Sequence, residues 1–267
     1  MEIVTIIMAV LGIIALYEPL CNYWTRYSQQ NQWKRFASQE MLYHLVVSRF
    51  SRYYNRLSTV DKQKFLFRTF VFHKSKRFHY VDIQEKPEMA ILISAAAVQL
   101  TFGLEKFSLN YFRNIYVLKD DYHYGFYSRP FQGHLDPTGG IYLSWDNFLK
   151  DFAGMTPNCN VGLHEMAHAL AYVNFITQTE EDKRFKKEFR GFSRVARPVF
   201  QGMQQGRKNI LGDYAATNYH EFWAVAVEVF FENPVRFRHE MPDLYDAMAK
   251  TLNQDPIAGI IARKIAA

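Results

Sequence analysis

Two histidines and a glutamate near the middle of the chain have the types and the spacing of a catalytic metal site. His164, Glu165 and His168 lie in VGLHEMAHALAYVNF, residues 161–175, which reads as an apolar helix. Histidines four positions apart lie one above the other on a helix, so their imidazoles can take two corners of one tetrahedral zinc site. Glu165 points about 100° away from His164, where it can reach a water beside the metal. The spacing therefore predicts a zinc ion (Zn²⁺) with two histidine ligands and a general base.

A third protein ligand is expected because a hydrolytic zinc site takes three and leaves one position for water. Neither glycine nor histidine follows His168 in the register of an extended motif, so this ligand must come from elsewhere. The best source is DYAATNYHEFWAVAVEVFFENP, residues 213–234, which we expect to form a second apolar helix. Glu221 and Glu228 are seven residues apart on one face, and His220 points about 100° away from Glu221. Spacing favours Glu221 and leaves Glu228 and His220 as alternatives.

Several shorter patterns indicate the elements that must position these residues. Helical periodicity runs from Met41 to Leu57, a further helix is expected from Ser58, and an apolar run at 88–102 suits a buried helix. Strand-like runs lie at 114–120 and 139–145. Thr156 and Pro157 resemble the start of the helix that carries the histidines. These elements predict an α+β fold that is mostly helical and has a small sheet.

Composition limits the class of protein. The 267 residues are 49% hydrophobic and 22% charged, which excludes a wholly disordered chain and permits a full core. The mean hydropathy of -0.23 argues against a membrane protein with several spans. Two cysteines, Cys21 and Cys159, are too few for a disulfide scaffold. We therefore expect one globular domain of about 220 residues.

The N-terminus differs from the rest of the chain. Residues 3–17 carry no charge, and lysine and arginine appear only after this run. We expect residues 1–21 to form a hydrophobic helix that anchors the protein in the inner membrane as a single pass, with residues 22–40 as a connector and the body at 41–267 facing the cytoplasm. The alternatives are an apolar helix docked on the protein's own surface and a soluble cytosolic protein.

A basic segment follows the connector. Between Arg49 and Arg77 nine lysines and arginines oppose the single acid Asp61. We interpret this charge as the solvated face of two amphipathic helices that could meet anionic lipid. Nucleic-acid binding is a weaker interpretation because no recognition motif accompanies the charge.

Three separated motifs together resemble a known family. HEMAH, the preceding GGIYLSWDNF and the later DYAATNYHEFWAVAVEVFFENP are similar to the Mlc titration factor A family of zinc-dependent peptidases, relatives of the catalytic domain of anthrax lethal factor, over residues 41–256. The resemblance implies a gluzincin-type zincin fold in which Glu221 completes the zinc site. It also implies that Tyr214 donates its hydroxyl to the transition-state oxyanion and that Glu228 partners a histidine ligand.

These observations predict a zinc-dependent metallopeptidase with aminopeptidase-like action on peptides. The substrate is expected to add as a strand to Ile141, Tyr142, Leu143 and Ser144. The main alternative is a membrane-tethered regulatory or interaction protein with a structural zinc site. A transcriptional repressor as a partner is implied by the resemblance alone.

Overall fold

The computed structural model describes residues 30–123, 131–156, 158–177 and 181–258. The chain divides into two compact units, residues 1–42 and 43–267, and each is described by itself. In the first unit, residues 30–37 are helical. The expected membrane helix at 1–21 lies outside the described residues, as do residues 22–29 of the connector expected at 22–40. In the part of the chain that is described, no helix combines the length and apolarity needed to cross a membrane. The N-terminal anchor therefore stays a prediction.

The described elements are mostly helices together with one small sheet, which agrees with the expected α+β class. The helices are α2 (Glu40–Phe50), α3 (Arg52–Arg56), α4 (Thr59–Ser75), α5 (Pro87–Thr101), α6 (Trp145–Phe152), α7 (Val161–Phe175), α8 (Lys183–Gln204), the 3₁₀ helix η1 (Asp213–Ala216), α9 (Tyr219–Glu232), α10 (Pro234–Glu240) and α11 (Pro242–Leu252). The strands are β1 (Arg77–Val81), β2 (Asn114–Leu118), β3 (Gly133–Asp136) and β4 (Gly140–Ser144).

The sheet is mixed, with the strand order β1-β2-β4-β3. Strands β1, β2 and β4 run parallel, and β3 pairs antiparallel with β4 at the edge. The chain reverses between β3 and β4 at Asp136, whose carbonyl accepts the amide hydrogen of Gly139. Gly139 has φ +103°, a conformation that glycine adopts without strain. This turn places β3 as an edge strand next to α7, the helix that carries the two histidines.

The two faces of the sheet differ in chemistry. Ile115, Val117, Ile141 and Leu143 are fully buried and form part of the core. The opposite face carries a row of stacked rings, one from each strand, because the paired residues occupy matching register positions. This row consists of His79, Tyr116, Tyr142 and His134. The buried face therefore supports the helices that hold the site.

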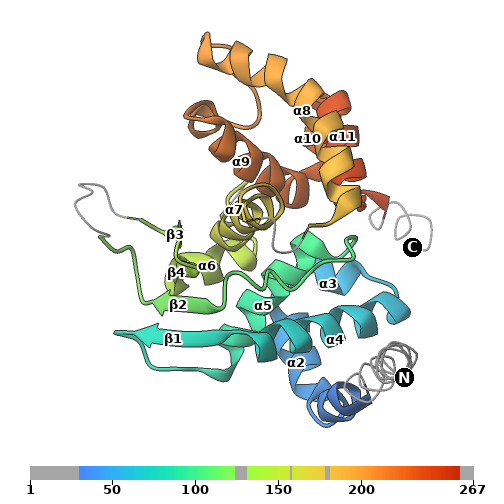
Figure 1. The fold of residues 1–267 in the computed structure, drawn as a ribbon, viewed down its shortest axis with the longest axis vertical. Helices are drawn as coiled ribbons and strands as arrows, with labels where there is room; N and C mark the ends of the chain where they lie inside the picture. The colour runs from blue at the N-terminus through green and yellow to red at the C-terminus, as the bar shows by residue number, and fades with distance from the viewer. Residues whose placement is uncertain (1–29, 124–130, 157, 178–180, 259–267) are drawn as a thin grey trace, which may run out of the picture. The chain divides into compact units, whose positions relative to one another are not determined.

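Helix α7 lies in the middle of the second unit, between α5 and α6 on one side and α9 on the other (Figure 1). Its close approach to α6 depends on Gly162, where a Cβ would lie 2.5 Å from the ring of Phe148. Helix α9 is held against α7 by the indole of Trp223, which donates to the carbonyl of Ala167 at 2.9 Å. The rings of three residues of α8 pack edge-on against the same indole: Phe185, Phe189 and Phe192. One tryptophan thus joins α7, α8 and α9.

Two members of the basic segment have structural roles, which corrects their interpretation as a solvated face. Arg68 donates to the carbonyls of Thr101, Phe102 and Leu104, which lie at the end of helix α5 and just after it. Lys76 is 8% exposed and donates to the carbonyls of the 108–109 loop. Because cations stabilise the unsatisfied carbonyls at a helix end, part of this charge serves the fold.

Several element boundaries differ from expectation, and three of them lie in the elements around the site. Helix α7 begins at Val161, with the side chain of Asn160 as its cap, so Thr156 does not start it. The expected helix over 213–234 is interrupted at Asn218, whose side chain accepts from the amides of the new first turn. The expected strand at 139–145 ends at Ser144, and Trp145 begins α6. Asparagine caps explain the first two differences because a side-chain acceptor starts a helix where it satisfies free amides.

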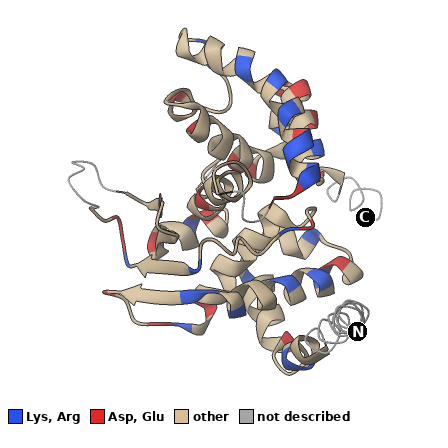
Figure 2. Ribbon diagram, in the orientation of Figure 1, with Lys and Arg blue, Asp and Glu red and all other residues tan. Residues whose placement is uncertain are grey.

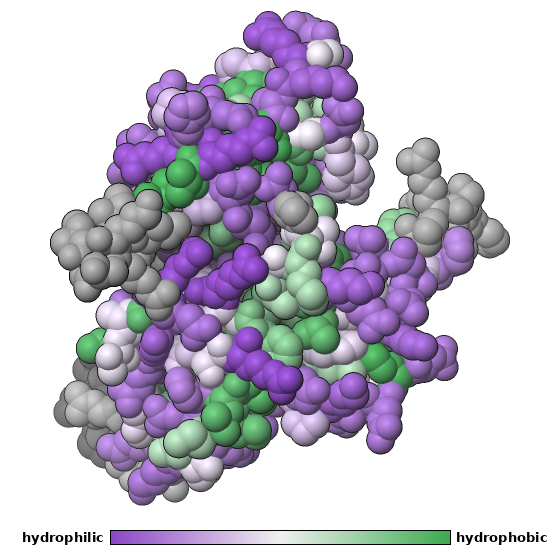
Figure 3. Space-filling model, turned by 180° about the vertical axis from the view of Figure 1, so that it is seen from behind, coloured by the Kyte–Doolittle hydropathy of each residue, from purple (hydrophilic) through white to green (hydrophobic). Residues whose placement is uncertain are grey.

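The face shown in Figure 3 is mostly hydrophilic, and hydrophobic residues appear on it in small patches. Large rings fill the interior instead, among them Tyr43, Tyr54, Phe65 and Phe70. The hydroxyl of buried Tyr43 is hydrogen-bonded to Nδ1 of His73 at 2.6 Å. The half-buried ring of His73 thus contacts the interior through this hydrogen bond.

Acidification is expected to weaken the fold through His73. Burial, with a contribution from the charge of Lys74, lowers the pKa of His73 to about 4. The unfolded chain protonates this side chain near pH 6.5, so stability is complete above that pH and falls as the pH approaches 4. We expect wild type to lose up to about 3 kcal/mol more of its unfolding free energy over this range than His73→Phe. Urea unfolding at several pH values measures this, and His239→Gln, at an exposed histidine, should keep the wild-type dependence.

Candidate metal centre

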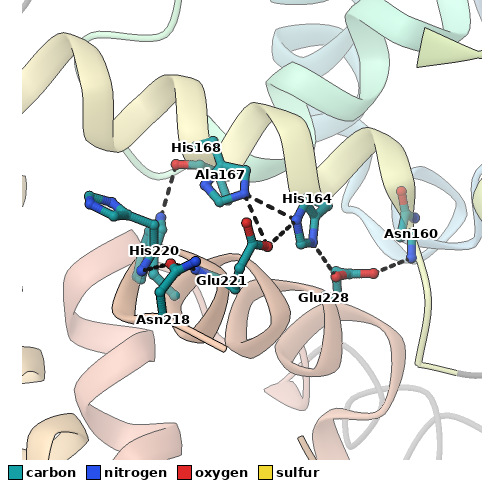
Figure 4. A network of polar contacts seen from close by, with 9 residues as sticks. Asn160, His164, Ala167, His168, Asn218, His220, Glu221 and Glu228 are labelled. Atoms are coloured by element: carbon teal, nitrogen blue, oxygen red, sulfur yellow. Dashed lines mark hydrogen bonds and ion pairs between the residues drawn. The ribbon is translucent and has the colours of Figure 1, made fainter. Parts of the chain in front are cut away.

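Helices α7 and α9 face each other and bring three metal-ligating side chains together (Figure 4). His164 and His168 come from α7, and Glu221 comes from the first turn of α9. One donor atom from each residue lies within 4.8 Å of the other two. The rival candidate His220 is not part of this group, nor is Glu228.

The donor atoms are at distances that suit one small cation. Nε2 of His164 lies 2.9 Å from Oε2 of Glu221 and 3.1 Å from Nε2 of His168. Nε2 of His168 lies 3.4 Å from the same Glu221 oxygen. In a tetrahedral zinc site with bonds near 2.0–2.1 Å, neighbouring donor atoms are about 3.3 Å apart. Two nitrogens and one oxygen at this spacing therefore fit a zinc ion as ligands.

Glu228 orients the first histidine from two turns further along α9. Its Oε1 accepts from Nδ1 of His164 at 2.6 Å, and its Oε2 accepts from the backbone N–H of Asn160 at 2.6 Å. Because a carboxylate only accepts, Nδ1 carries the hydrogen and Nε2 of His164 faces the other ligands. Glu228 thus lies beside the donor group as a partner of the histidine, the place that the resemblance implied.

The charges of the group are strongly coupled. Burial lowers the pKa of His164, but its hydrogen bonds to Glu221 and Glu228 outweigh this effect and raise the pKa to about 10. Burial raises the pKa of Glu221, and the hydrogen bonds from His164 and His168 overcome it and hold the pKa well below its usual range. The carboxylates therefore stabilise positive charge at this point, where a cation would sit.

Glu165 is buried at the edge of the same group. It is 4% exposed, and its Oε2 has no hydrogen-bond partner among the described residues. Burial raises the pKa of Glu165 to about 7, although the charge of His164 opposes the shift. An ionised carboxylate is costly to bury without a donor, so the free oxygen marks a place for a water or a ligand group.

Strand β3 leaves space for Glu165 because its first residue is a glycine. A Cβ on Gly133 would lie 2.7 Å from both Cγ and Oε1 of Glu165. Any side chain at this position would displace the carboxylate. The edge strand and Glu165 therefore fit against each other because position 133 has no side chain.

Tyr214 stands on η1 and not on the helix of Glu221. Its ring centroid is 6.1 Å from that of His164, and the residue is 59% exposed. Partial burial and the negative charge of Glu221 raise the pKa of Tyr214 to about 12. The hydroxyl therefore keeps its proton at neutral pH and can donate a hydrogen bond beside the donor group.

The expected substrate strand is wrong in its location. Ile141, Tyr142, Leu143 and Ser144 form β4, which pairs with β2 on one side and with β3 or its preceding residue on the other. A strand with two neighbours has no free backbone edge to accept a peptide. The edge strand beside α7 is β3, which sequence reasoning missed because only four residues, with a histidine and an aspartate among them, form it.

Strand β3 offers a short open edge. The amide of Ser144 donates to the carbonyl of Gln132, so the alternation of an antiparallel ladder turns the backbone groups of Gly133 and Leu135 away from β4. These are the groups that an added strand would use.

Two cavities meet beside the candidate ligands His164, His168 and Glu221, which we call the metal group. The first, about 760 Å³, is bordered by β3, α7, α8 and α9, and we call it the α8-side cavity. The second, about 810 Å³, is bordered by the start of α7 and by the 210–212 loop, and we call it the Cys159-side cavity. Gly133, His164, Glu165 and Tyr214 line both. A ligand crossing from one cavity to the other would pass these residues.

The three donor atoms, the buried carboxylate of Glu165 and the adjoining cavities define a candidate metallohydrolase centre in a mostly helical α+β protein. The chain belongs to the glucose-regulated metallo-peptidase M90 family, whose model matches residues 24–252. This confirms the resemblance inferred from the three motifs and supports the expected enzyme class.

A curated relative adds little about activity. The uncharacterized protein slr2042 of Synechocystis sp. is 25% identical over 126 residues. The match covers 46% of this chain and 46% of the relative, so the chain spans about half the length of the curated protein that it matches.

Removing a ligand should affect metal binding more than removing its partner. Glu221→Ala deletes a donor atom, whereas Glu228→Ala leaves all three donors but frees the ring of His164. We expect Glu228→Ala to weaken zinc binding by about 10–100-fold and Glu221→Ala to weaken it further. Zinc titration of the metal-free variants by calorimetry measures both, with the exposed Asp243→Ala on α11 as a control. A larger loss from Glu228→Ala would exchange the two roles.

Proposed function

We propose that the protein is a zinc-dependent metallopeptidase with a zincin-type fold. One observation carries the proposal: the donor atoms of His164, His168 and Glu221 converge beside a buried, unpartnered oxygen of Glu165. Family membership supports the metallopeptidase class. The choice of zinc rests on the two imidazoles and one carboxylate, a donor set typical of catalytic zinc sites.

The three ligands would hold the ion, and the neighbouring residues would do the proton transfer. Bound there, zinc would supply Lewis acidity that lowers the pKa of a water and polarises the scissile carbonyl. Glu165 takes the proton from the attacking water and passes it to the leaving amine. Burial raises the pKa of Glu165, which favours its holding the proton between these two steps. Glu228 keeps His164 in the required tautomer.

Tyr214 and β3 would position the substrate. The Tyr214 hydroxyl donates to the developing oxyanion, since the side chain remains protonated. The substrate adds as a strand to the open edge at Gly133 and Leu135, which brings its backbone alongside Glu165. The substrate class is therefore a peptide or protein in extended form.

The cleavage specificity, the membrane attachment and the protein partner are proposed from the sequence alone. Aminopeptidase-like cleavage is one of these proposals, and comparing peptides with free and acetylated N-termini tests it. Attachment to the membrane through residues 1–21 and a transcriptional repressor as partner are the other two. A structural zinc site is disfavoured because structural sites use four protein ligands, whereas this group has three and adjoins a free carboxylate.

Replacing the base should abolish turnover without removing the metal. Glu165→Gln keeps the shape of the side chain but cannot accept the proton, so we expect kcat/KM to fall by about 10²–10⁴-fold. Zinc content should equal that of wild type. A chelator should abolish the peptidase activity of wild type, and added zinc should restore that activity. The peptidase assay uses Asp243→Asn as a control, and activity surviving in Glu165→Gln would refute the mechanism.

Removing one hydroxyl should lower the rate and leave substrate binding nearly intact. Tyr214→Phe keeps the ring and loses the oxyanion donor, so we expect kcat to fall by about 10²–10³-fold with little change in KM. Steady-state kinetics on a peptide substrate measures both constants. Tyr142→Phe, in the ring row on the opposite face of the sheet, is the matched control. Equal kcat values for Tyr214→Phe and wild type would remove Tyr214 from the mechanism.

A further inference from the structure

Helix α8 carries a row of positive charges along its exposed side. Its members follow one another at intervals of three or four positions, so they lie along one face of the helix. They are all exposed, and we call them the α8 stripe: Lys183, Lys187, Arg190, Arg194 and Arg197. Figure 2 shows these basic positions along α8.

The charges of the α8 stripe are not neutralised within the described part of the protein. At the N-terminal end of α8, an ion pair joins Lys186 and Glu181, neither of which belongs to the stripe. Arg197 places its guanidinium over the ring of Tyr219, 5.7 Å from the centroid, and keeps its charge exposed. No described carboxylate forms an ion pair with a stripe residue, so the row is available to an anionic partner.

The α8 stripe ends at the cavity that holds the metal group. Arg197 lines the α8-side cavity together with Phe189 and Ser193 of the same helix. His168 and Glu221 line the same cavity. The distance along the axis from Lys183 to Arg197 is about 21 Å at 1.5 Å per residue. The row therefore forms a track that runs from open surface to the candidate centre.

We propose that the α8 stripe binds an acidic segment of the peptide substrate and guides it to the metal group. This inference rests on the proposed peptidase function and names its substrate class. Successive turns of α8 place the charges about 5.4 Å apart, and alternate side chains of an extended peptide are about 6.6–6.8 Å apart. Because these two spacings are similar, the carboxylates at alternate positions of the peptide can pair with successive lysines and arginines of the α8 stripe. Each exposed pair contributes little, but several together give binding and electrostatic steering.

Other anionic partners fit this surface less well. A helix that lies in a lipid interface inserts large apolar side chains, and none of the exposed large hydrophobic residues in the described chain belongs to α8. The apolar side of α8 is used instead to pack against Trp223. Nucleic acid would not require the row to end at a hydrolytic centre. The position at the cavity favours a peptide.

The test compares acidic and neutral peptides with a stripe variant. The variant Lys187→Gln/Arg190→Gln/Arg194→Gln removes three charges and spares Arg197 in the cavity. The control Arg49→Gln/Lys74→Gln/Arg77→Gln removes three exposed charges on α2, α4 and β1. Each full-length protein is assayed with a neutral peptide and with two acidic versions of it, which carry four glutamates either before or after the cleaved sequence. We expect wild type and control to favour one acidic version by about 10-fold in kcat/KM at low salt, and the stripe variant to lose this preference.

A binding measurement separates this inference from the proposed function. Fluorescence anisotropy records binding of the labelled acidic peptide to full-length Glu165→Gln, with and without the stripe substitutions. Weaker binding on loss of the stripe supports the inference even if no peptide is cleaved, a result that would refute the peptidase alone. Equal binding with and without the stripe overturns it. Stripe-dependent binding of a DNA oligonucleotide or of phosphatidylglycerol vesicles, without binding of the acidic peptide, also overturns it.

Discussion

The carboxylate of Glu228 is the interaction on which the candidate centre depends. It accepts from the backbone at the start of α7 and from the ring of His164, so one side chain on α9 contacts the backbone of α7 and orients the ring of a candidate ligand. Seven residues earlier on the same face, Glu221 reaches the two imidazoles. Two turns of one helix thus provide a ligand and its alignment, because residues seven apart share a helix face.

The rest of the fold keeps these two helices in contact. Trp223 ties α9 to the backbone of α7 and is enclosed by rings from α8, while Gly162 lets α6 approach from another side. The sheet contributes an edge strand, in which Gly133 has no side chain and so leaves space for the buried carboxylate of Glu165. Close packing transmits such positions accurately because protein interiors have few voids. The chemistry therefore depends on packing contacts at residues that carry no charge.

Helical spacing placed His164 and His168 together in the sequence because residues four apart share a helix face. It favoured Glu221 on the later helix but left Glu228 and His220 as alternatives, and the family resemblance selected Glu221. The helix starts were harder to predict. Asn160 and Asn218 cap their helices by accepting from free backbone amides, and residue type alone does not show which asparagine does so. Strand β3 was missed because four residues give too little alternation to recognise, and the substrate edge was therefore placed on β4. The roles of Arg68 and Lys76 required the positions of distant carbonyls.

The shortness of β3 has a consequence for the behaviour of the protein at high concentration. An unpaired strand edge can join the edge of another molecule, and long, flat edges lead to aggregation. Here only Gly133 and Leu135 turn their backbone groups outward, and Pro137 follows directly after the strand. Proline cannot donate a backbone hydrogen bond, so it prevents the ladder from extending. An edge this short can hold a few residues of a guest chain, yet it offers two copies of the protein too few hydrogen bonds to start a growing sheet.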